Sequence, residues 1–388
     1  MEKFLKGKER GMTLSEDIRD FALDLGFSKV GIAEAEPFPE YIAELKSRYQ
    51  MYSWFIEGPR QLMKGADPRS LMPTAKSIVV VAHDFYKKSF PEELLGKIGR
   101  LYQARAYNAP PHRLNGARRQ LLKEFLEKNG CKVLADPTIP ARLSAARAGV
   151  ATYGRNTFAF AEGIGSFIVI STFLVDKELD YDKPTMEVKC PPKCTACIDA
   201  CPTGALYEPL RMNPFRCIAF NTFTAQDGRT GGISSYIPPE IREKMGSWIH
   251  GCDICQEVCP RNQKKLKANL PPDEYLVKIA RDFDLIRLLK LSDEFFAKSV
   301  QPLMYNYISE KKYFQRNAAI AVGNTGDSSF VPVLSESMQE AEGMVRGYVA
   351  WALGKIGGSQ ARHILEISLA RETIESVKKE IVAALGAA

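Results

Sequence analysis

The segment CPPKCTACIDACP, residues 190–202, spaces four cysteines closely and ends on a Cys-Pro pair. A second segment, GCDICQEVCP at residues 251–260, repeats the Cys-x3-Cys-Pro ending, and Cys217 stands between the two. Thiolate sulfur is the soft ligand that iron–sulfur clusters require, and in two-cluster ferredoxins the cysteine before proline ligates the other cluster. Eight of the nine cysteines therefore predict two [4Fe-4S] clusters, and with them a protein that transfers electrons.

The exchange of a ligand between the two arrays assigns each thiolate to one cluster. Cluster one takes Cys190, Cys194, Cys197 and Cys259. Cluster two takes Cys201, Cys217, Cys252 and Cys255. The gap at residues 191–193 holds three residues, where the usual bacterial run holds two. A pair of structural zinc sites is the alternative, because Cys-x2-Cys is also typical of zinc ribbons, but the repeated Cys-x3-Cys-Pro ending favours clusters.

Cysteine usage and composition indicate an enzyme of a reducing compartment. Disulfide-dense secreted proteins are typically short, whereas this chain has 388 residues, 45% of them hydrophobic and 26% charged. Residues 1–13 are charged and lack the apolar stretch of a signal peptide, and no run is long enough to span a bilayer. We therefore expect a soluble, cytoplasmic protein. The net charge of +7 permits a polyanionic partner without requiring one.

The first part of the chain predicts a mixed α/β domain. Residues 13–16 form a capping box that opens an amphipathic helix, and a second helix is predicted at residues 114–126. Strands are predicted at residues 29–33, 77–82, 131–135 and 167–175. The β-branched run at 77–82 is expected in the centre of a single four-stranded sheet. Cys131 lies outside any metal spacing and is expected to be a small buried hydrophobe on the third strand.

Two loops of this domain carry polar residues in apolar surroundings. Asp136-Pro137-Thr138 follows the third strand, and open α/β sheets bind ligands at the carboxyl ends of strands; an ordinary turn is the alternative. Glycines let the backbone approach a flat cofactor closely. The second loop, residues 148–157, combines two glycines with an aromatic residue, a cation and an amide: Gly149, Tyr153, Gly154, Arg155 and Asn156. No metal-ligand spacing relates the histidines, which are His83, His112, His250 and His363.

The last part of the chain predicts helix pairs with a repeat. Gly323, Gly354 and Gly386 recur every 31 to 32 residues, which is compatible with small HEAT-like units that stack into a binding surface. Basic residues take similar places in the repeats and predict one basic edge: Arg316, Arg346, Lys378 and Lys379. Such an edge is either a solvated face or a track for phosphates, which residues 261–267 would extend. The predicted domains are an α/β domain, a ferredoxin-like module and a helical domain, at residues 1–180, 181–268 and 269–388.

Together these motifs resemble the epoxyqueuosine reductase family, corrinoid iron–sulfur enzymes related to reductive dehalogenases. The resemblance is strongest across residues 147–263 and extends more loosely over nearly the whole chain. Its motifs include Arg147-Ala148-Gly149, Gly154-Arg155-Asn156-Thr157, Cys201-Pro202-Thr203-Gly204-Ala205, Arg216-Cys217-Ile218 and Gly251-Cys252-Asp253.

The resemblance implies a cobalamin held base-off in the α/β domain, two [4Fe-4S] clusters that conduct electrons, and a helical domain that helps to hold tRNA. The implied reaction is the last step of queuosine biosynthesis, in which the epoxide at the tRNA wobble position is reduced to an alkene with electrons from a low-potential donor such as ferredoxin or flavodoxin. Asp136 is the implied proton donor, and Tyr153 is the alternative donor. The implied cofactor contacts are Arg147, Gly149, Tyr153, Gly154, Arg155 and Asn156.

Two segments depart from the family pattern, and both belong to the substrate side. Residues 136–142 lack the expected Thr-Gly-Pro and acidic-Arg spelling, and residues 105–113 replace the usual Gly-Arg-Asp-Tyr-His. The alternative function is therefore a corrinoid iron–sulfur reductase of a small molecule, a paralogue similar to reductive dehalogenases. A plain electron carrier would bind two clusters and no corrinoid, and the large α/β domain argues against it.

Overall fold

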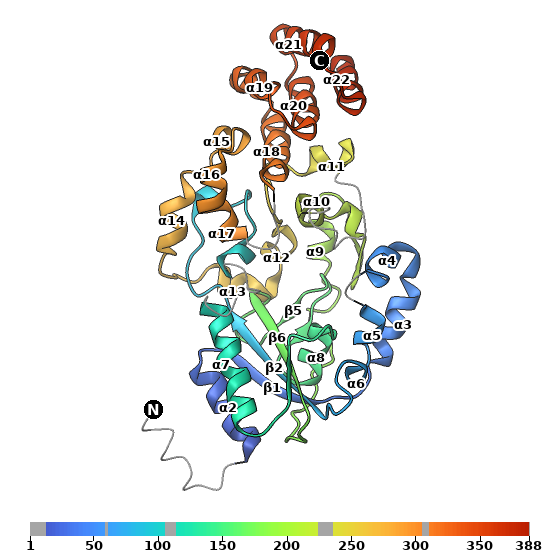
Figure 1. Cartoon of the computed structure of the whole chain (residues 1–388), viewed down its shortest axis with the longest axis vertical. Helices are drawn as coiled ribbons and strands as arrows, with labels where there is room; N and C mark the ends of the chain where they lie inside the picture. The colour runs from blue at the N-terminus through green and yellow to red at the C-terminus, as the bar shows by residue number, and fades with distance from the viewer. Residues whose placement is uncertain (1–12, 59–60, 105–113, 224–235, 305–309, 388) are drawn as a thin grey trace.

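The computed structural model describes residues 13–58, 61–104, 114–223, 236–304 and 310–387. The departing segment 105–113 and most of the charged segment 1–13 lie outside the described residues. Figure 1 shows a sheet near one end of the molecule, a stack of helices at the other end, and the cysteine-rich segments between them. None of the described helices is long and apolar enough to cross a membrane.

One antiparallel sheet organises the first part of the chain. Its strands are β1 (Lys29–Glu34), β2 (Ser77–Asp84), β3 (Val133–Ala135) and β6 (Ile168–Val175), in the order β1-β2-β6-β3. The prediction of one sheet with residues 77–82 inside it is confirmed. Every neighbouring pair is antiparallel, so the rule that locates ligands at the carboxyl ends of parallel strands does not apply to the loop after β3. That argument for a ligand site at Asp136 is wrong. The role of Asp136 is inferred from the contacts of its side chain instead.

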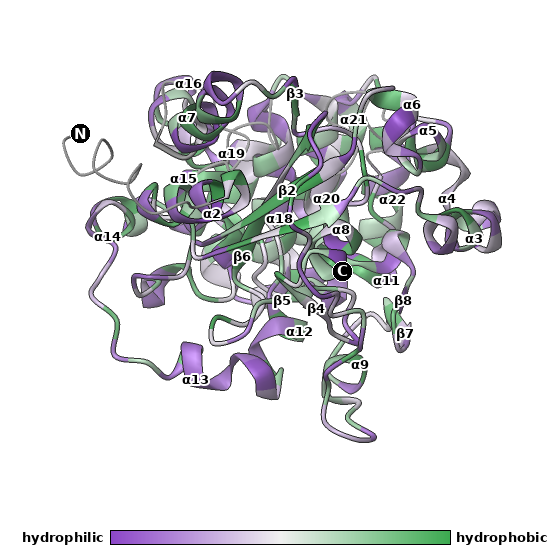
Figure 2. Ribbon diagram, turned by 90° about the horizontal axis from the view of Figure 1, so that it is seen from below, coloured by the Kyte–Doolittle hydropathy of each residue, from purple (hydrophilic) through white to green (hydrophobic). Residues whose placement is uncertain are grey.

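Both faces of the sheet are covered, because successive side chains of β2 enter different cores. Val79 packs with the helices α2 (Leu14–Asp24) and α7 (Leu114–Lys128), whereas Val80 packs with α8 (Ala141–Arg147) on the other face. Figure 2 shows β2 and β6 as apolar strands inside the fold. The consecutive apolar residues of β2 follow from this double coverage.

Local signals at the start of two elements behave as the sequence predicts. Thr13 and Glu16 exchange hydrogen bonds at the start of α2, which confirms the capping box. Cys131 is buried in the core between the sheet and α7, as expected of a small hydrophobe. It lies just before β3 and not on it, because pairing with β6 begins only at Val133.

Short elements surround the sheet and carry the cysteine arrays. The first part of the chain adds a hairpin of β4 (Thr152–Tyr153) with β5 (Ala159–Phe160) and the helices α3 (Pro39–Ser47), α4 (Tyr49–Ile56), α5 (Leu62–Gly65) and α6 (Pro68–Leu71). The cysteine-rich part contains α9 (Ala196–Asp199), β7 (Leu206–Glu208), β8 (Arg211–Met212), α10 (Ile218–Phe223), α11 (Pro239–Lys244), α12 (Ile254–Glu257) and α13 (Gln263–Leu266). The helices that follow are α14 (Glu274–Ala280), α15 (Leu285–Leu289), α16 (Asp293–Phe295) and α17 (Gln301–Met304).

The last part of the described chain is a stack of helices, which confirms the predicted repeat. It comprises α18 (Lys311–Thr325), α19 (Val331–Ser337), α20 (Gly343–Ile356), α21 (Ser359–Arg371) and α22 (Glu375–Ala387). Two of the recurring glycines, Gly323 and Gly354, mark where helices cross. A Cβ atom at Gly323 would lie 2.9 Å from the Cα atom of Ala352, and one at Gly354 would lie 2.7 Å from the Cα atom of Ala384. Glycine therefore lets α18, α20 and α22 approach one another closely.

The predicted basic edge of this stack is wrong for Arg316 and Arg346, whereas Lys379 is exposed. Arg316 is fully buried and donates to the carbonyl oxygens of Asn221 and Thr222. Arg346 pairs with the carboxylate of Glu372, with its Nε atom 2.7 Å from Oε2. The repeat places equivalent residues on the same side of each helix, but in α18 and α20 that side faces neighbouring segments instead of solvent.

The glycine crossings lead to a stability prediction. Gly354→Ala should destabilise the stack by about 1–3 kcal/mol, because the added methyl group meets backbone atoms of α22 that have no room to move. Hydrogen exchange of the α20 and α22 amides would measure the change as faster exchange. Gly386→Ala is the matched control, because a Cβ atom there meets nothing within 4 Å. Equal protection in both variants would contradict the packing argument.

Candidate iron–sulfur centre and substrate site

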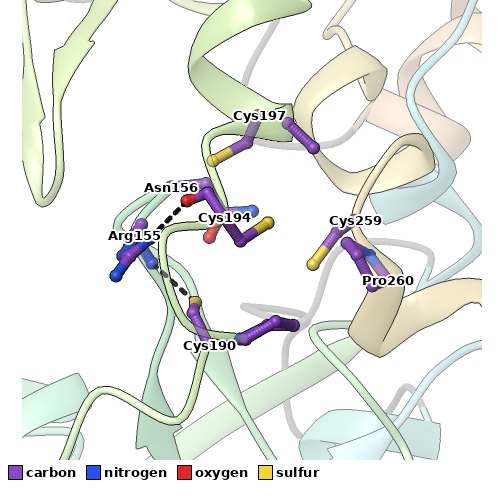
Figure 3. Close-up of a pocket in the computed structure, with 9 residues that line it drawn as sticks. Arg155, Asn156, Cys190, Cys194, Cys197, Cys259 and Pro260 are labelled. Atoms are coloured by element: carbon purple, nitrogen blue, oxygen red, sulfur yellow. Dashed lines mark hydrogen bonds between the residues drawn. The ribbon is translucent and has the colours of Figure 1, made fainter.

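Four cysteines from both arrays surround one cavity of about 280 Å³, part of which is open to solvent (Figure 3). Cys259 comes from the second array and meets three members of the first, as the predicted exchange of ligands requires. These are the four residues predicted to bind cluster one. The cavity is lined by Arg155, Asn156, Cys190, Pro191, Cys194, Ala196, Cys197, Cys259 and Pro260.

The three residues between Cys190 and Cys194 form a turn that accommodates the additional residue. Lys193 adopts a left-handed backbone conformation with φ +57°, and the amide of Cys194 donates to the carbonyl oxygen of Pro191 at 3.1 Å. Arg155 stabilises this turn with two hydrogen bonds. Its backbone amide donates to the Cys190 sulfur at 3.4 Å, and its guanidinium donates to the Cys194 carbonyl oxygen at 2.5 Å. The additional residue therefore does not keep Cys190 away from the cavity.

The four cysteines predicted to bind cluster two also lie near one another. Cys252 is within electrostatic range of Cys201 and Cys217, and Cys255 is within range of Cys217 and Cys252. Burial raises the pKa of the Cys217 and Cys252 thiols, and it raises the pKa of Cys255 well above its ordinary value. Because only thiolates bind metal, a cluster assembled here has to displace these protons.

The zinc alternative finds no preformed site. In the part of the chain that the structure describes, no group of three or more His, Cys, Asp or Glu side chains is arranged to hold a single metal ion. A zinc ion needs four ligand atoms within about 2.3 Å of one point, whereas the thiolates of a cubane stand around a larger body. The thiols spaced around the cluster-one cavity suit a cubane better.

The glycine-containing loop contacts the cysteine segments. Asn156 lines the cluster-one cavity, and its Nδ2 atom donates to the carbonyl oxygen of Cys255 at 3.2 Å, so this loop touches both arrays. A Cβ atom at Gly154 would lie 2.3 Å from the Phe160 ring, and one at Gly149, where φ is +69°, would lie 2.8 Å from the carbonyl oxygen of Lys183. Both glycines thus permit close packing within the protein itself.

Arg147 is held by the segment before α3. Its guanidinium donates to the carbonyl oxygens of Glu36 and Pro37 at 3.0 Å and to the carboxylate of Glu40 at 2.9 Å, and it lies 3.9 Å from the centre of the Phe38 ring. These contacts account for a structural role, in which Arg147 anchors α3 to α8.

Asp136 lies on the loop after β3 in a left-handed conformation with φ +47°. Its Oδ2 atom accepts a hydrogen bond from Nη1 of Arg119 on α7 at 2.5 Å. The side chain keeps 41% of its surface exposed, yet desolvation by the surrounding protein raises the pKa of the carboxyl group, and Arg119 opposes that rise. The structure thus holds a carboxyl group that is easier to protonate than an ordinary aspartate.

Tyrosines gather around Arg142, a residue at the start of α8 that the sequence analysis did not single out. Tyr41, Tyr52 and Tyr153 are all within its electrostatic range. Burial raises the pKa of Tyr153 to about 12, which keeps its phenol protonated. Tyr52 also lies within electrostatic range of Cys217, a predicted ligand of cluster two. The Tyr52 side chain is therefore near both the start of α8 and cluster two. Only the spatial meeting of α3, α4, β4 and α8 reveals this group.

Buried polar contacts fasten the cysteine segments to the rest of the fold. The amide of Arg100 donates to Asp253, between two predicted cluster-two ligands, at 2.6 Å. Asn317 of α18 donates to the carbonyl oxygens of Thr222 and Ile249 at 2.8 and 2.7 Å. Lys265 binds the carboxylate of Asp84 at the end of β2 at 2.6 Å. The second array is therefore held from several sides.

Comparison with known families defines the class of protein. Residues 190–262 match the family described as 4Fe-4S double cluster binding domain, and residues 301–386 match HEAT repeats. The chain is thus an iron–sulfur protein with two [4Fe-4S] clusters and a helical-repeat domain.

Whole-chain comparisons define the family. The chain is 32% identical to epoxyqueuosine reductase of Bacillus cereus over 95% of its own length and 96% of that relative. It is similar to the structure of epoxyqueuosine reductase from Bacillus subtilis, in which the catalytic aspartate loop is swung out of the active site, with a TM-score of 0.80, 30% identity, and coverage of 96% and 98%. A crystal structure of epoxyqueuosine reductase with an epoxyqueuosine-modified tRNA-Tyr stem loop matches with a TM-score of 0.77, 29% identity, and coverage of 96% and 98%. The chain belongs to the epoxyqueuosine reductase family.

The ligand assignment predicts the iron content of cysteine variants. Cys259→Ser should lower the iron content from roughly eight to roughly four atoms per chain, because it removes one ligand of cluster one and none of cluster two. Iron and sulfide analysis of anaerobically prepared protein, with EPR of the reduced form, would measure the loss. Cys131→Ser is the control and should keep all of the iron, since Cys131 is buried in the core of the sheet. Undiminished iron in the first variant would refute the assignment.

Proposed function

We propose that this protein reduces epoxyqueuosine in tRNA to queuosine, the last step of queuosine biosynthesis. The proposal rests above all on the match to epoxyqueuosine reductases over nearly the whole chain, cysteine arrays included. The reaction consumes two electrons and two protons, and the epoxide oxygen leaves as water while the alkene forms. The protein therefore needs an electron path, a proton donor and a surface for tRNA.

Cobalamin, held base-off, is the proposed redox cofactor, and when bound it supplies the cobalt chemistry that opens the epoxide. We place this cofactor beside Arg142, Tyr153 and Tyr52, which combine flat rings with polar groups and lie within electrostatic range of one another's segments. The described histidines lie elsewhere. His83 is beside Arg118, His250 is enclosed by aromatic rings, and His363 belongs to α21. The residues present thus fit a corrin without a histidine ligand near these tyrosines.

The residues proposed for the site divide into three roles. Asp136 donates a proton to the leaving oxygen, and Tyr153 is the alternative donor. The residues proposed to border the cofactor are Arg147, Gly149, Tyr153, Gly154, Arg155 and Asn156. Among them, Arg155 also holds the cluster-one turn, and Asn156 binds the carbonyl oxygen of Cys255. The eight cysteines ligate the two clusters as assigned above, and electrons arrive from a low-potential donor such as ferredoxin or flavodoxin.

Two properties of the relatives support the roles of Asp136 and of tRNA. A catalytic aspartate lies on a movable loop in the Bacillus subtilis enzyme, and Asp136 also lies on a loop, in a conformation that asparagine and aspartate adopt more readily than most residues. A relative has been crystallised with a tRNA stem loop, and the net charge of +7 favours binding of a polyanion. We propose the cytoplasm as the location and residues 1–180, 181–268 and 269–388 as the three domains.

The direct test is turnover of modified tRNA. Protein reconstituted with iron, sulfide and cobalamin, and reduced anaerobically, should convert epoxyqueuosine in tRNA to queuosine, which mass spectrometry of digested nucleosides would detect. Protein without cobalamin is the control and should leave the epoxide intact. If the loaded protein leaves the epoxide unchanged but dehalogenates a small organohalide, the paralogue function replaces this proposal.

The proton donor leads to a prediction about pH. Asp136 acts when protonated, so activity should be constant below its folded pKa and fall about tenfold per pH unit above it. Arg119→Met should move the falling limb to higher pH, because loss of the cation raises the pKa of Asp136 further, whereas Arg119→Lys should move it less. The pH profile of single-turnover rates would measure both shifts.

Substitution of the two donor candidates decides between them. Asp136→Asn should lower the rate about 10²- to 10⁴-fold, and Tyr153→Phe should have a small effect. The opposite result would transfer the role to Tyr153. Retained cluster and corrin absorbance in each variant would show that the site remains assembled.

A further inference from the structure

The two clusters of this fold differ in how the protein covers them. The turn over the cluster-one cavity is a single layer of chain, in which Pro191, Pro192 and Lys193 are exposed while Pro191 also lines the cavity. The neighbouring helix α9 lies at the edge of the molecule in Figure 2. A carrier in solution can therefore approach cluster one at this turn.

The loop that carries two ligands of cluster two is fastened to buried partners. Between its predicted ligands, Asp253 is buried against Arg100, and Asn317 of the helical stack binds the carbonyl oxygen of Ile249 just before Cys252. The exposed turn at residues 191–193 therefore makes cluster one the natural entry point for electrons.

The surface beside this entry point is basic. Lys183, Lys189 and Lys193 are exposed on the segment 183–193, in which Glu187 is the sole acidic residue. The preceding acid, Asp182, is bound by Arg19 at 3.0 Å and by the amide of Ile32 at 2.8 Å. The segment thus presents three lysines and one carboxylate to solvent next to cluster one.

The same segment also exposes apolar side chains. Met186 and Val188 keep 42% and 39% of their surface exposed, although the backbone of this segment is fixed. Val188 forms a β-bridge with Tyr153, and Thr185 donates to the carbonyl oxygen of Ala151 at 2.7 Å. A small apolar patch with a charged rim on rigid backbone is typical of a transient protein interface.

We propose that residues 183–193, the entry loop, form the docking surface for a small acidic one-electron carrier protein. The carrier gives up one electron and cluster one accepts it, with no proton or bond transferred. Opposite charge raises the rate of encounter, and the apolar centre provides a short-lived contact. The proposal rests on the electron path proposed above and adds where electrons enter and from what kind of partner.

The test measures cluster reduction without tRNA. Lys189→Glu combined with Lys193→Glu should slow reduction of the clusters by reduced flavodoxin, an acidic carrier, about tenfold at low ionic strength. The deficit should shrink as salt rises, because screening removes the electrostatic attraction. Stopped-flow absorbance of the reconstituted full-length protein gives the second-order rate constant. Reduced methyl viologen, a small cation that needs no docking surface, should reduce the variant at least as fast as the unaltered protein.

The matched control changes the same charge elsewhere. Lys378→Glu combined with Lys379→Glu alters α22 at the far end of the molecule and should leave the rate with flavodoxin within twofold. Equal rates for the two double variants would overturn the proposal. So would weaker binding of a tRNA stem loop with an unchanged flavodoxin rate, since the lysines would then belong to an RNA surface. Because the assay reads cluster reduction alone, its outcome does not depend on whether the epoxide is the substrate.

Discussion

Burial of cysteine thiols is the constraint on which the rest of this structure depends. Burial raises the pKa of Cys217, Cys252 and Cys255, and these thiols ligate iron only after losing their protons. The thiols come from separate segments of the chain. A bound cluster therefore cross-links these segments in addition to conducting electrons. Because each cluster takes ligands from both arrays, each cluster holds the two segments together.

Buried polar contacts extend this arrangement outward. Arg100 holds the loop at Asp253, Asn317 holds two segments that precede the second array, and Lys265 joins the cysteine segments to β2. Removal of one partner from such a contact leaves a desolvated group behind, which makes each contact specific as well as stabilising. The helical stack is therefore packed directly on the segments next to the second cysteine array.

Sequence reasoning succeeded where the chemistry is local. The cysteine spacing was informative because a cluster requires thiolates a few residues apart, and β2 was recognised because a doubly covered strand needs consecutive apolar residues. It failed where orientation mattered. Arg316 and Arg346 share a repeat position, but helix packing turns Arg316 into the core and Arg346 toward Glu372. The glycines at 149 and 154 were interpreted as room for a flat cofactor, yet the nearest atoms belong to the protein itself.

The sequence by itself determined the double-cluster module, the four-stranded sheet, the helical repeat and the family. Each of these depends on residue type at short or regular spacing, which the linear chain records directly. Only the tertiary structure decided that Arg119 faces Asp136 and that tyrosines of three other elements lie within electrostatic range of Arg142. Those relations join residues distant in the chain, and they arise from packing geometry, which leaves no periodic or local trace in the sequence.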